Sequence, residues 1–260
     1  MELKHAFMKR PLDLLSTALL IFAPLAAMGA SVPVSPARNP VLVELFTSEG
    51  CSSCPPADAL LDELDRTQPF PNAELIVLSE HVDYWNQLGW KDPFSSAIFS
   101  ARQNQYATHF GLQEVYTPQI VIDGTWQGVG GDSNQIHRIV QKAAAQPKLP
   151  IPLEASRNAN RGSLQLTITS PAGGPAADVY LVLAKNHVTS YVAHGENARR
   201  TLSHTSVAYR ITKIGVLKPG AEYEKHLSVD LPTTPDQTRA IIYAQDRSTG
   251  KILAVTQAVL

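Results

Sequence analysis

The strongest constraint on the fold of this chain is the segment V-L-V-E-L-F-T-S-E-G-C-S-S-C-P-P, from Val41 to Pro56, which contains the only two cysteines. The apolar run at its start predicts a buried strand. The two prolines at its end predict the first turn of a helix, where a backbone N–H is not needed. Cys51 and Cys54 are therefore expected where a strand ends and a helix begins.

This position gives the two thiols different properties. The dipole and free N–H groups at a helix start stabilise an anion, so the thiolate of Cys51 should be favoured. Cys54, one turn further along, should be more shielded. Dithiol exchange needs this asymmetry, because one thiol forms a mixed disulfide and a second thiol nearby resolves it.

Three other interpretations compete with a redox pair. A structural disulfide is one, although closing so short a loop constrains the unfolded chain little. Zinc would need four ligands and usually a second cysteine pair, which the chain lacks. Copper held by Cys51, Cys54 and His81 is the third.

The N-terminus predicts a secretory signal peptide over residues 1–30. A basic start is followed by an apolar run from Leu14 to Ala27 and then by small residues. The run is shorter than a membrane-spanning helix and contains Pro24, so a retained anchor is less favoured. We expect an exported protein, periplasmic or secreted, in which a disulfide can persist.

Two domains are expected after the signal peptide. Residues 38–146 alternate short apolar runs with helical periodicity, which predicts an α/β domain, and Gln146 to Pro152 reads as a linker. Residues 151–260 show short period-two strands between turns, which predicts an antiparallel β-sandwich. The formal net charge of −1, without blocks of like charge, argues against nucleic acid or an anionic membrane as a partner.

A second motif, V-Y-T-P-Q-I-V-I-D-G from Val115 to Gly124, places a proline before a predicted hairpin strand whose Asp-Gly suits a tight turn. With the cysteines, this order of elements resembles the thioredoxin superfamily over about residues 38–146. The resemblance implies a cis proline beside the C-x-x-C that binds substrate backbone. It carries over to Cys51, Cys54, Thr117 and Pro118.

Glu44 resembles, more weakly, the buried acid of the thioredoxin strand. It would take a proton from the resolving thiol; the alternative is that it faces solvent. Gly50 and the Ser52-Ser53 pair depart from thioredoxin, and these positions tune the direction of electron flow. The chain is also similar to secreted bacterial proteins without a settled function, which share T-S-E-G-C-S-S-C-P-P, H-V-D-Y-W and a β-rich second half.

Two polar segments are candidates for shaping the site. The loop from Ser79 to Phe94 follows the second predicted strand, and we expect it to roof the dithiol. Its substrate-contacting or tuning residues would be His81, Asp83, Trp85 and Trp90; the alternative is a loop packed by its own aromatics. The segment from His194 to His204 would either face the dithiol or form a solvated hairpin tip.

The function predicted from the sequence is an exported thiol-disulfide oxidoreductase that needs no cofactor or metal. Its partners would be protein or small-molecule thiols and disulfides. Cys51 would attack, Cys54 would resolve and Pro118 would position the substrate. The alternatives are a copper-binding module and a non-catalytic interaction protein.

Overall fold

The computed structural model describes residues 1–2, 38–158, 162–231 and 238–260. The predicted signal peptide therefore lies almost wholly outside the described residues. Within the described ranges, no helix is both long and apolar enough to cross a membrane. Residues from Pro36 to Leu260 form one compact unit.

Three helices occur in the described part of the chain, all in its first half: α1 (Pro55–Thr67), α2 (Ala97–Phe110) and α3 (Ser133–Ala144). Helix α1 starts at the two prolines, as predicted, and buries Leu60, Leu61 and Leu64. Helix α2 ends at Gly111, whose φ of 66° is left-handed. Helix α3 is capped by Asp132, which accepts a hydrogen bond from the Gln135 N–H.

The first-half strands are β1 (Asn39–Thr47), β2 (Ala73–His81), β3 (Gln119–Ile122) and β4 (Trp126–Val129). Strand β1 pairs in parallel with β2 and antiparallel with β3, which forms the predicted hairpin with β4. At its turn, Asp123 and Gly124 both have positive φ, at 51° and 60°.

The second half contributes only strands to the described structure. They are β5 (Leu153–Asn158), β6 (Ser163–Ser170), β7 (Ala177–Val192), β8 (Arg200–Leu217), β9 (Tyr223–Asp230), β10 (Thr238–Gln245) and β11 (Ile252–Val259). Strands β7 and β8 form a long antiparallel hairpin, whose tip is residues 193–199.

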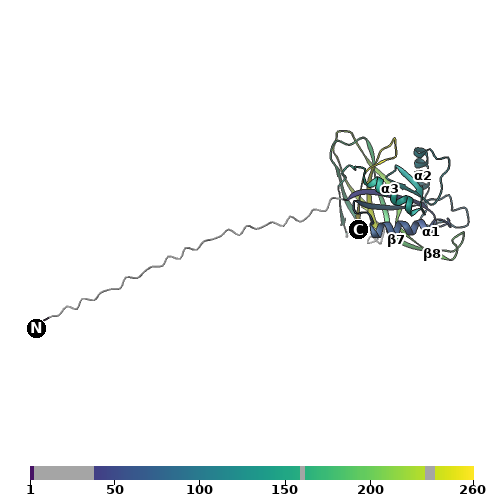
Figure 1. The fold of residues 1–260 in the computed structure, drawn as a ribbon, viewed down its shortest axis with the longest axis horizontal. Coiled ribbons are helices and arrows are strands. Elements are labelled where there is room, and N and C mark those ends of the chain that lie inside the picture. Colours follow the sequence, from purple (N-terminus) through teal and green to yellow (C-terminus); the bar gives the residue numbers. More distant parts are fainter. Residues whose placement is uncertain (3–37, 159–161, 232–237) are drawn as a thin grey trace. The chain divides into compact units, whose positions relative to one another are not determined.

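The expected fold class, a thioredoxin-like α/β domain followed by a sandwich-like β domain, is wrong. One mixed eight-stranded sheet, in the order β11-β10-β7-β8-β2-β1-β3-β4, takes strands from both halves of the chain (Figure 1). The halves join where β2 pairs in parallel with β8, at Ser79 and Val207. A second sheet in the described residues has three strands, in the order β5-β6-β9.

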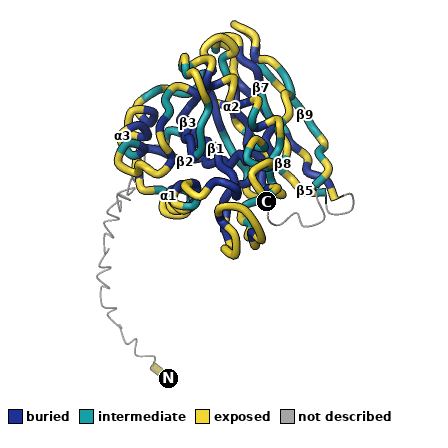
Figure 2. The backbone as a smooth tube through the Cα atoms, turned by 90° about the vertical axis from the view of Figure 1, so that its right-hand side faces the viewer, coloured by how far each residue is buried: buried dark blue, intermediate teal, exposed yellow. Residues whose placement is uncertain are grey.

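A shared apolar core explains why the halves do not separate. Leu42 and Leu78, from β1 and β2, lie in one buried cluster with Val182, Ile241 and other side chains of the second half. The opposite face of β1 and β2 packs against α1 and α3. Because both faces of these strands are covered, β1 and β2 run through the dark-blue interior in Figure 2.

Candidate active site

The two cysteines form a disulfide at the start of α1, with their Cα atoms 5.4 Å apart. Backbone bonds from Cys51 N–H to Ser48 O and from Cys54 N–H to Cys51 O fold this loop tightly. The Ser53 hydroxyl lies 3.3 Å from the Cys51 sulfur. Both cysteines are fully buried, whereas Ser52 and Ser53 are exposed.

Pro118 lies beside the first turn of α1. A Cβ on Gly130 would come within 2.8 Å of the Ala57 Cβ and 3.0 Å of the Pro118 Cβ, so glycine permits this close approach. The Thr117–Pro118 peptide bond is cis. Trp85 donates its indole N–H to the Thr117 hydroxyl at 2.8 Å. The structure thus brings Thr117, Pro118 and Trp85 together.

A buried acid–base group flanks the dithiol. Glu49 precedes Cys51 by two residues and Asp58 follows Cys54 by one helical turn; both side chains are buried. His204, on β8, lies between them, with Nε2 3.4 Å from a Glu49 oxygen and Nδ1 3.5 Å from a carboxylate oxygen of Asp58. These are ion-pair distances rather than short hydrogen bonds. We call Glu49, Asp58 and His204 the acid–histidine group.

The acid–histidine group shifts two pKa values. Burial alone would lower the pKa of His204, but interactions with Asp58 and Glu49 outweigh it and raise that pKa to about 9. Burial alone would raise the pKa of Glu49, yet its interaction with His204 and hydrogen bonds from Ser190 and the Trp90 indole hold it below its usual value. At neutral pH, the group therefore contains a protonated histidine.

The tip of the β7–β8 hairpin covers the dithiol. The fully buried Asn197 side chain donates to the backbone carbonyls of Glu49 and Cys51, both at 2.9 Å. Glu196 accepts a hydrogen bond from the Ser52 N–H at 3.1 Å, and its interactions with the side chain and the backbone of Ser52 lower the pKa of the Glu196 carboxyl. The segment from His194 to His204 thus includes a hairpin tip that faces the dithiol.

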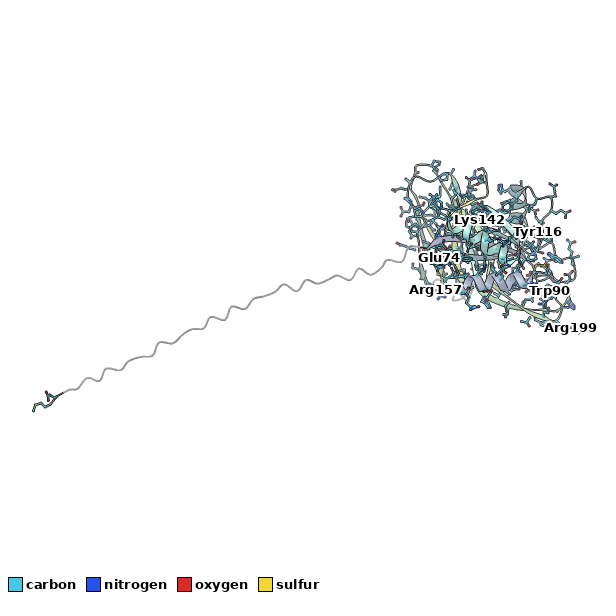
Figure 3. All side chains as sticks on the ribbon, viewed as in Figure 1. Glu74, Trp90, Tyr116, Lys142, Arg157 and Arg199 are labelled. Carbon is cyan, nitrogen blue, oxygen red and sulfur yellow. A yellow bond between two sulfur atoms is a disulfide. The ribbon has the colours of Figure 1, made fainter. Side chains whose placement is uncertain are left out.

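The predicted loop from Ser79 to Phe94 meets the same hairpin tip. Gly195, at a φ of 79°, packs against Trp90, and a Cβ there would lie 3.1 Å from the Trp90 Cβ. Figure 3 shows Trp90 and Arg199 at the same end of the folded body, away from Glu74. Trp90 and Trp85 are each partly exposed.

His81 and Asp83 have partners within or near their own loop. His81 is fully buried, and its Nδ1 lies 2.7 Å from Asp92, while its ring packs edge-on against His204 with centroids 4.6 Å apart. Asp83 accepts a hydrogen bond from the Ser100 hydroxyl of α2 at 2.5 Å. His81 therefore adjoins the acid–histidine group, whereas Asp83 anchors the loop to a helix.

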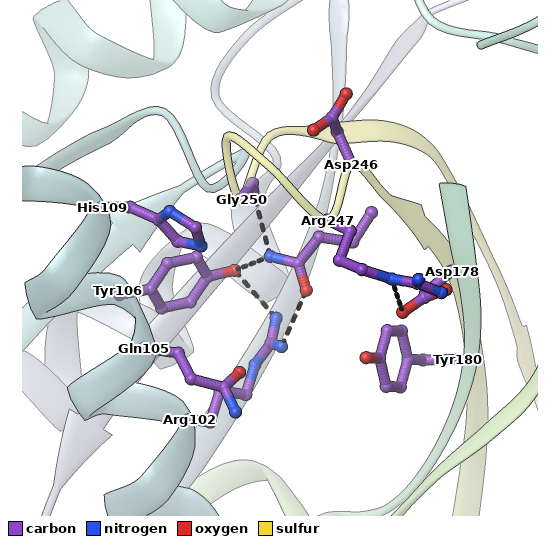
Figure 4. A pocket seen from close by; sticks show the side chains of 10 residues that line it. Arg102, Gln105, Tyr106, His109, Asp178, Tyr180, Asp246, Arg247 and Gly250 are labelled. Carbon is purple, nitrogen blue, oxygen red and sulfur yellow. Dashed lines mark hydrogen bonds and ion pairs between the residues drawn. The ribbon is translucent and has the colours of Figure 1, made fainter. Parts of the chain in front are cut away.

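Glu44 is buried on the α2 side of β1, so the alternative that it faces solvent is wrong. Its carboxylate binds the Arg102 guanidinium, at 2.5 Å, and the Tyr106 hydroxyl, at 2.6 Å. Figure 4 shows Arg102 and Tyr106 side by side at the wall of a small cavity of about 60 Å³. The role of Glu44 as proton acceptor for Cys54 stays a prediction.

The copper alternative would need Cys51, Cys54 and His81 to lie close together as ligands. Within the described ranges, no three or more histidine, cysteine, aspartate or glutamate side chains gather as a metal-ligand group. His81 therefore does not complete a three-ligand set with Cys51 and Cys54 in this structure.

The sequence interpretation missed Glu49, Asp58 and Asn197. A local signal existed for Asp58, because its four-residue spacing from Cys54 places both on one face of α1. Glu49 lies within the conspicuous T-S-E-G-C segment. Asn197 and His204 lay in a segment recognised as polar, but their contacts depend on the long-range pairing of β7 with β8.

No curated protein matches this chain. A crystal structure of protein AGR_C_4864 from Agrobacterium tumefaciens is similar, at 25% sequence identity and a TM-score of 0.66. That match covers 86% of this chain and 95% of the other. A weaker match, to the sporulation control protein Spo0M of Bacillus subtilis, has 12% identity, a TM-score of 0.29 and coverage of 43% and 46%.

The matching family model does not confirm the thioredoxin resemblance. The family model that matches is described as "Protein of unknown function (DUF1223)", and it covers residues 42–245. This range includes both cysteines, the loop from Ser79 to Phe94 and the β7–β8 hairpin. Because the match spans most of the chain, the protein belongs to the DUF1223 family.

Proposed function

We propose that this protein is an exported thiol-disulfide oxidoreductase whose redox centre is Cys51 and Cys54. The observation that carries the proposal is the disulfide at the N-terminus of α1, formed by the only two cysteines of the chain. Closing a three-residue separation contributes little stability through loop entropy, so reversible chemistry is a better reason for the bond than stapling.

The surroundings of the dithiol support a thiolate at Cys51. The N-terminus of α1, which is the positive end of the helix dipole, lies at the two cysteines, and the Ser53 hydroxyl is placed to donate a hydrogen bond to the Cys51 sulfur once the disulfide is reduced. Pro118 lies beside α1, where it would position a substrate, and Thr117 and Trp85 would extend this surface.

The proposed reaction balances without a cofactor. The Cys51 thiolate attacks one sulfur of a substrate disulfide; the substrate S–S bond breaks, and one substrate thiolate leaves and takes up a proton. The Cys54 thiolate then attacks the Cys51 sulfur, which releases the second substrate thiol. Two electrons pass from the dithiol to the substrate, and the reverse sequence oxidises a substrate dithiol.

Trapping of the mixed disulfide tests the proposal. Cys54→Ser should accumulate mixed disulfides through Cys51 in the exporting cell, because the resolving thiol is absent. The matched control is the Cys51→Ser, Cys54→Ser double variant, which should trap nothing. If Cys54→Ser traps no more than this control, and the purified wild-type protein exchanges no disulfides with a small neutral disulfide, the proposal fails.

A further inference from the structure

A cavity of about 450 Å³ opens directly beside the redox centre, between α1 and the β7–β8 hairpin. It starts at Pro55, the residue after Cys54, and its volume lies within the range of small-ligand pockets, roughly 300–1,000 Å³. Its walls come from the two halves of the chain. The residues used below are Asp58 and Asp62 from α1 and Arg200 from β8.

The α1 wall is acidic and incompletely partnered. Asp58 is 5% exposed, and its Oδ1 accepts no hydrogen bond. His204 Nδ1 lies 3.5 Å from this oxygen. This is an ion-pair distance, but the two atoms form no hydrogen bond. Asp62, one helical turn further on, adds a second, partly exposed carboxylate, one oxygen of which accepts a hydrogen bond from the Thr205 hydroxyl at 2.6 Å and lies 3.8 Å from His187. Because a buried oxygen without a donor is costly, a ligand N–H group would improve this wall.

The β8 wall is basic. Arg200 is exposed and donates one hydrogen bond, at 2.7 Å, to the Asn197 side chain. No carboxylate within the described ranges forms an ion pair with it. The other guanidinium N–H groups are therefore available, and their planar fork suits a carboxylate. Arg200 also holds Asn197, the residue that bonds the Cys51 carbonyl, so this wall is coupled to the dithiol.

We propose that this cavity binds a small zwitterionic thiol or disulfide of the amino-acid type, with its ammonium group at Asp58 and Asp62 and its carboxylate at Arg200. The inference rests on the proposed function and names its substrate class. It also fits the burial of both cysteines under the hairpin tip, which leaves more room for a small molecule than for a folded protein surface.

The exchange with such a substrate needs no further reactant. A dithiol and a symmetrical amino-acid disulfide yield the Cys51–Cys54 disulfide and two amino-acid thiols; the ligand S–S bond breaks, and two electrons move to the ligand. The reverse reaction oxidises two ligand thiols.

Binding is tested with ligands that cannot exchange. Calorimetric titration of the oxidised full-length mature protein with S-methylcysteine should show saturable binding. Arg200→Gln should weaken it by about tenfold, which corresponds to one charge-assisted contact. Arg199→Gln, with the same charge change on a residue outside the cavity, should leave it unchanged. Asp62→Asn provides a second variant if Arg200→Gln does not fold.

Two ligands that each lack one charged group test which wall of the cavity binds the ammonium group and which binds the carboxylate. With 3-(methylthio)propanoate, which lacks the ammonium group, Asp62→Asn should have no weakening effect, and Arg200→Gln should still weaken binding. With 2-(methylthio)ethylamine, which lacks the carboxylate, the pattern should reverse. The inference is overturned if S-methylcysteine does not bind, or if Arg200→Gln and Asp62→Asn bind it as tightly as wild type.

Failure of the cavity assignment is distinguishable from failure of the proposed function. If S-methylcysteine fails to bind but Cys54→Ser still traps mixed disulfides, the cavity assignment is wrong and the oxidoreductase stands. If S-methylcysteine binds with the expected variant pattern but trapping and exchange both fail, the oxidoreductase is wrong and the cavity is a binding site alone.

Discussion

Two buried carboxylates from the same stretch of chain, Glu44 and Glu49, have different partners. Glu44 is paired with Arg102 of α2 at 2.5 Å, and both side chains lie within the core. Glu49 is paired with His204 of β8 at 3.4 Å, two residues before Cys51. An arginine keeps its charge at every accessible pH, whereas a histidine does not.

The difference separates a structural ion pair from an adjustable one. Arg102 is held by Glu44, Glu80 and Tyr106, and the neighbouring charge of Glu44 helps to raise its pKa well above the usual value against the opposing effect of burial. The charge of the acid–histidine group, by contrast, depends on a pKa of about 9. We therefore expect changes at Arg102 to affect folding and changes around His204 to affect both folding and the dithiol.

The largest expected effect is at Arg102. Arg102→Met should lower the free energy of unfolding by about 3–5 kcal/mol, because Glu44 and Glu80 would lose their buried cation. Urea unfolding followed by circular dichroism measures this. Arg138→Met, at an exposed position of α3, should change stability by less than about 0.5 kcal/mol. Equal losses in the two variants would contradict the structural role of Arg102.

The second effect depends on pH. Since the folded-state pKa of His204 is raised from 6.5 to about 9, its contribution is fully present below pH 6.5 and is lost as pH rises through 9. His204→Gln should therefore cost about 3 kcal/mol near pH 6.5, and the difference from wild type should shrink toward pH 9 and above. Urea unfolding across this range gives the difference curve.

The difference curve is needed because Glu80 titrates in an overlapping range. Burial raises the pKa of Glu80 to about 8, so its ionisation weakens folding progressively above pH 4.5 in both proteins. This contribution cancels in the comparison. His226→Gln, at an exposed position on β9, is the matched control and should follow wild type. A difference that stays flat between pH 6.5 and 9 would contradict a protonated His204.

The third effect concerns access to the disulfide. Asn197→Ala removes two hydrogen bonds that hold the hairpin tip on Glu49 and Cys51. At about 1 kcal/mol for each bond, or about 2 kcal/mol for the two, reduction by dithiothreitol should accelerate by up to roughly thirtyfold. The rate is measured by stopping the reduction at intervals, alkylating the free thiols and separating the products by gel shift. Asn104→Ala, on α2, is the control; a rate unchanged in Asn197→Ala would show that the tip does not limit access.

The smallest effect is at the sulfur itself. Ser53→Ala removes the hydroxyl that lies 3.3 Å from the Cys51 sulfur, so it should raise the pKa of the reduced Cys51 thiol by up to about one unit. The pH dependence of alkylation of Cys51 measures this pKa in a Cys54→Ser background. Ser52→Ala, at an exposed neighbouring position, should have no comparable effect on this pKa. Equal pKa shifts in the two variants would contradict the role of Ser53.

The parts of the fold that sequence patterns predicted have local causes. The start of α1 follows from Pro55 and Pro56, and the β3–β4 hairpin follows from Asp123 and Gly124. Strand β1 follows from the apolar residues on both sides of Glu44. In each case, the signal lies within a few residues of the element that it specifies.

The single sheet could not be predicted in the same way. The apolar sequence of β2 predicts a buried strand, but it does not tell which strand pairs with its edge. In the structure this partner is β8, through the bridge between Ser79 and Val207. The same limit applies to the candidate site. The cysteines and Pro118 belong to recognisable motifs, whereas the pairing of Glu49 with His204 depends on where the β7–β8 hairpin folds back.

The apolar cluster that Leu42, Ile76 and Leu78 share with Val182 and Ile241 has a consequence for cooperativity. Chain cleavage within Gln146 to Pro152, followed by separation of the halves, would expose a continuous apolar surface on each fragment, and such surfaces promote aggregation. Neither fragment is thus expected to be an autonomous folding unit. The redox centre and the strands that cover it should fold and unfold in one transition. The dithiol therefore gains its native surroundings only when the whole chain has folded.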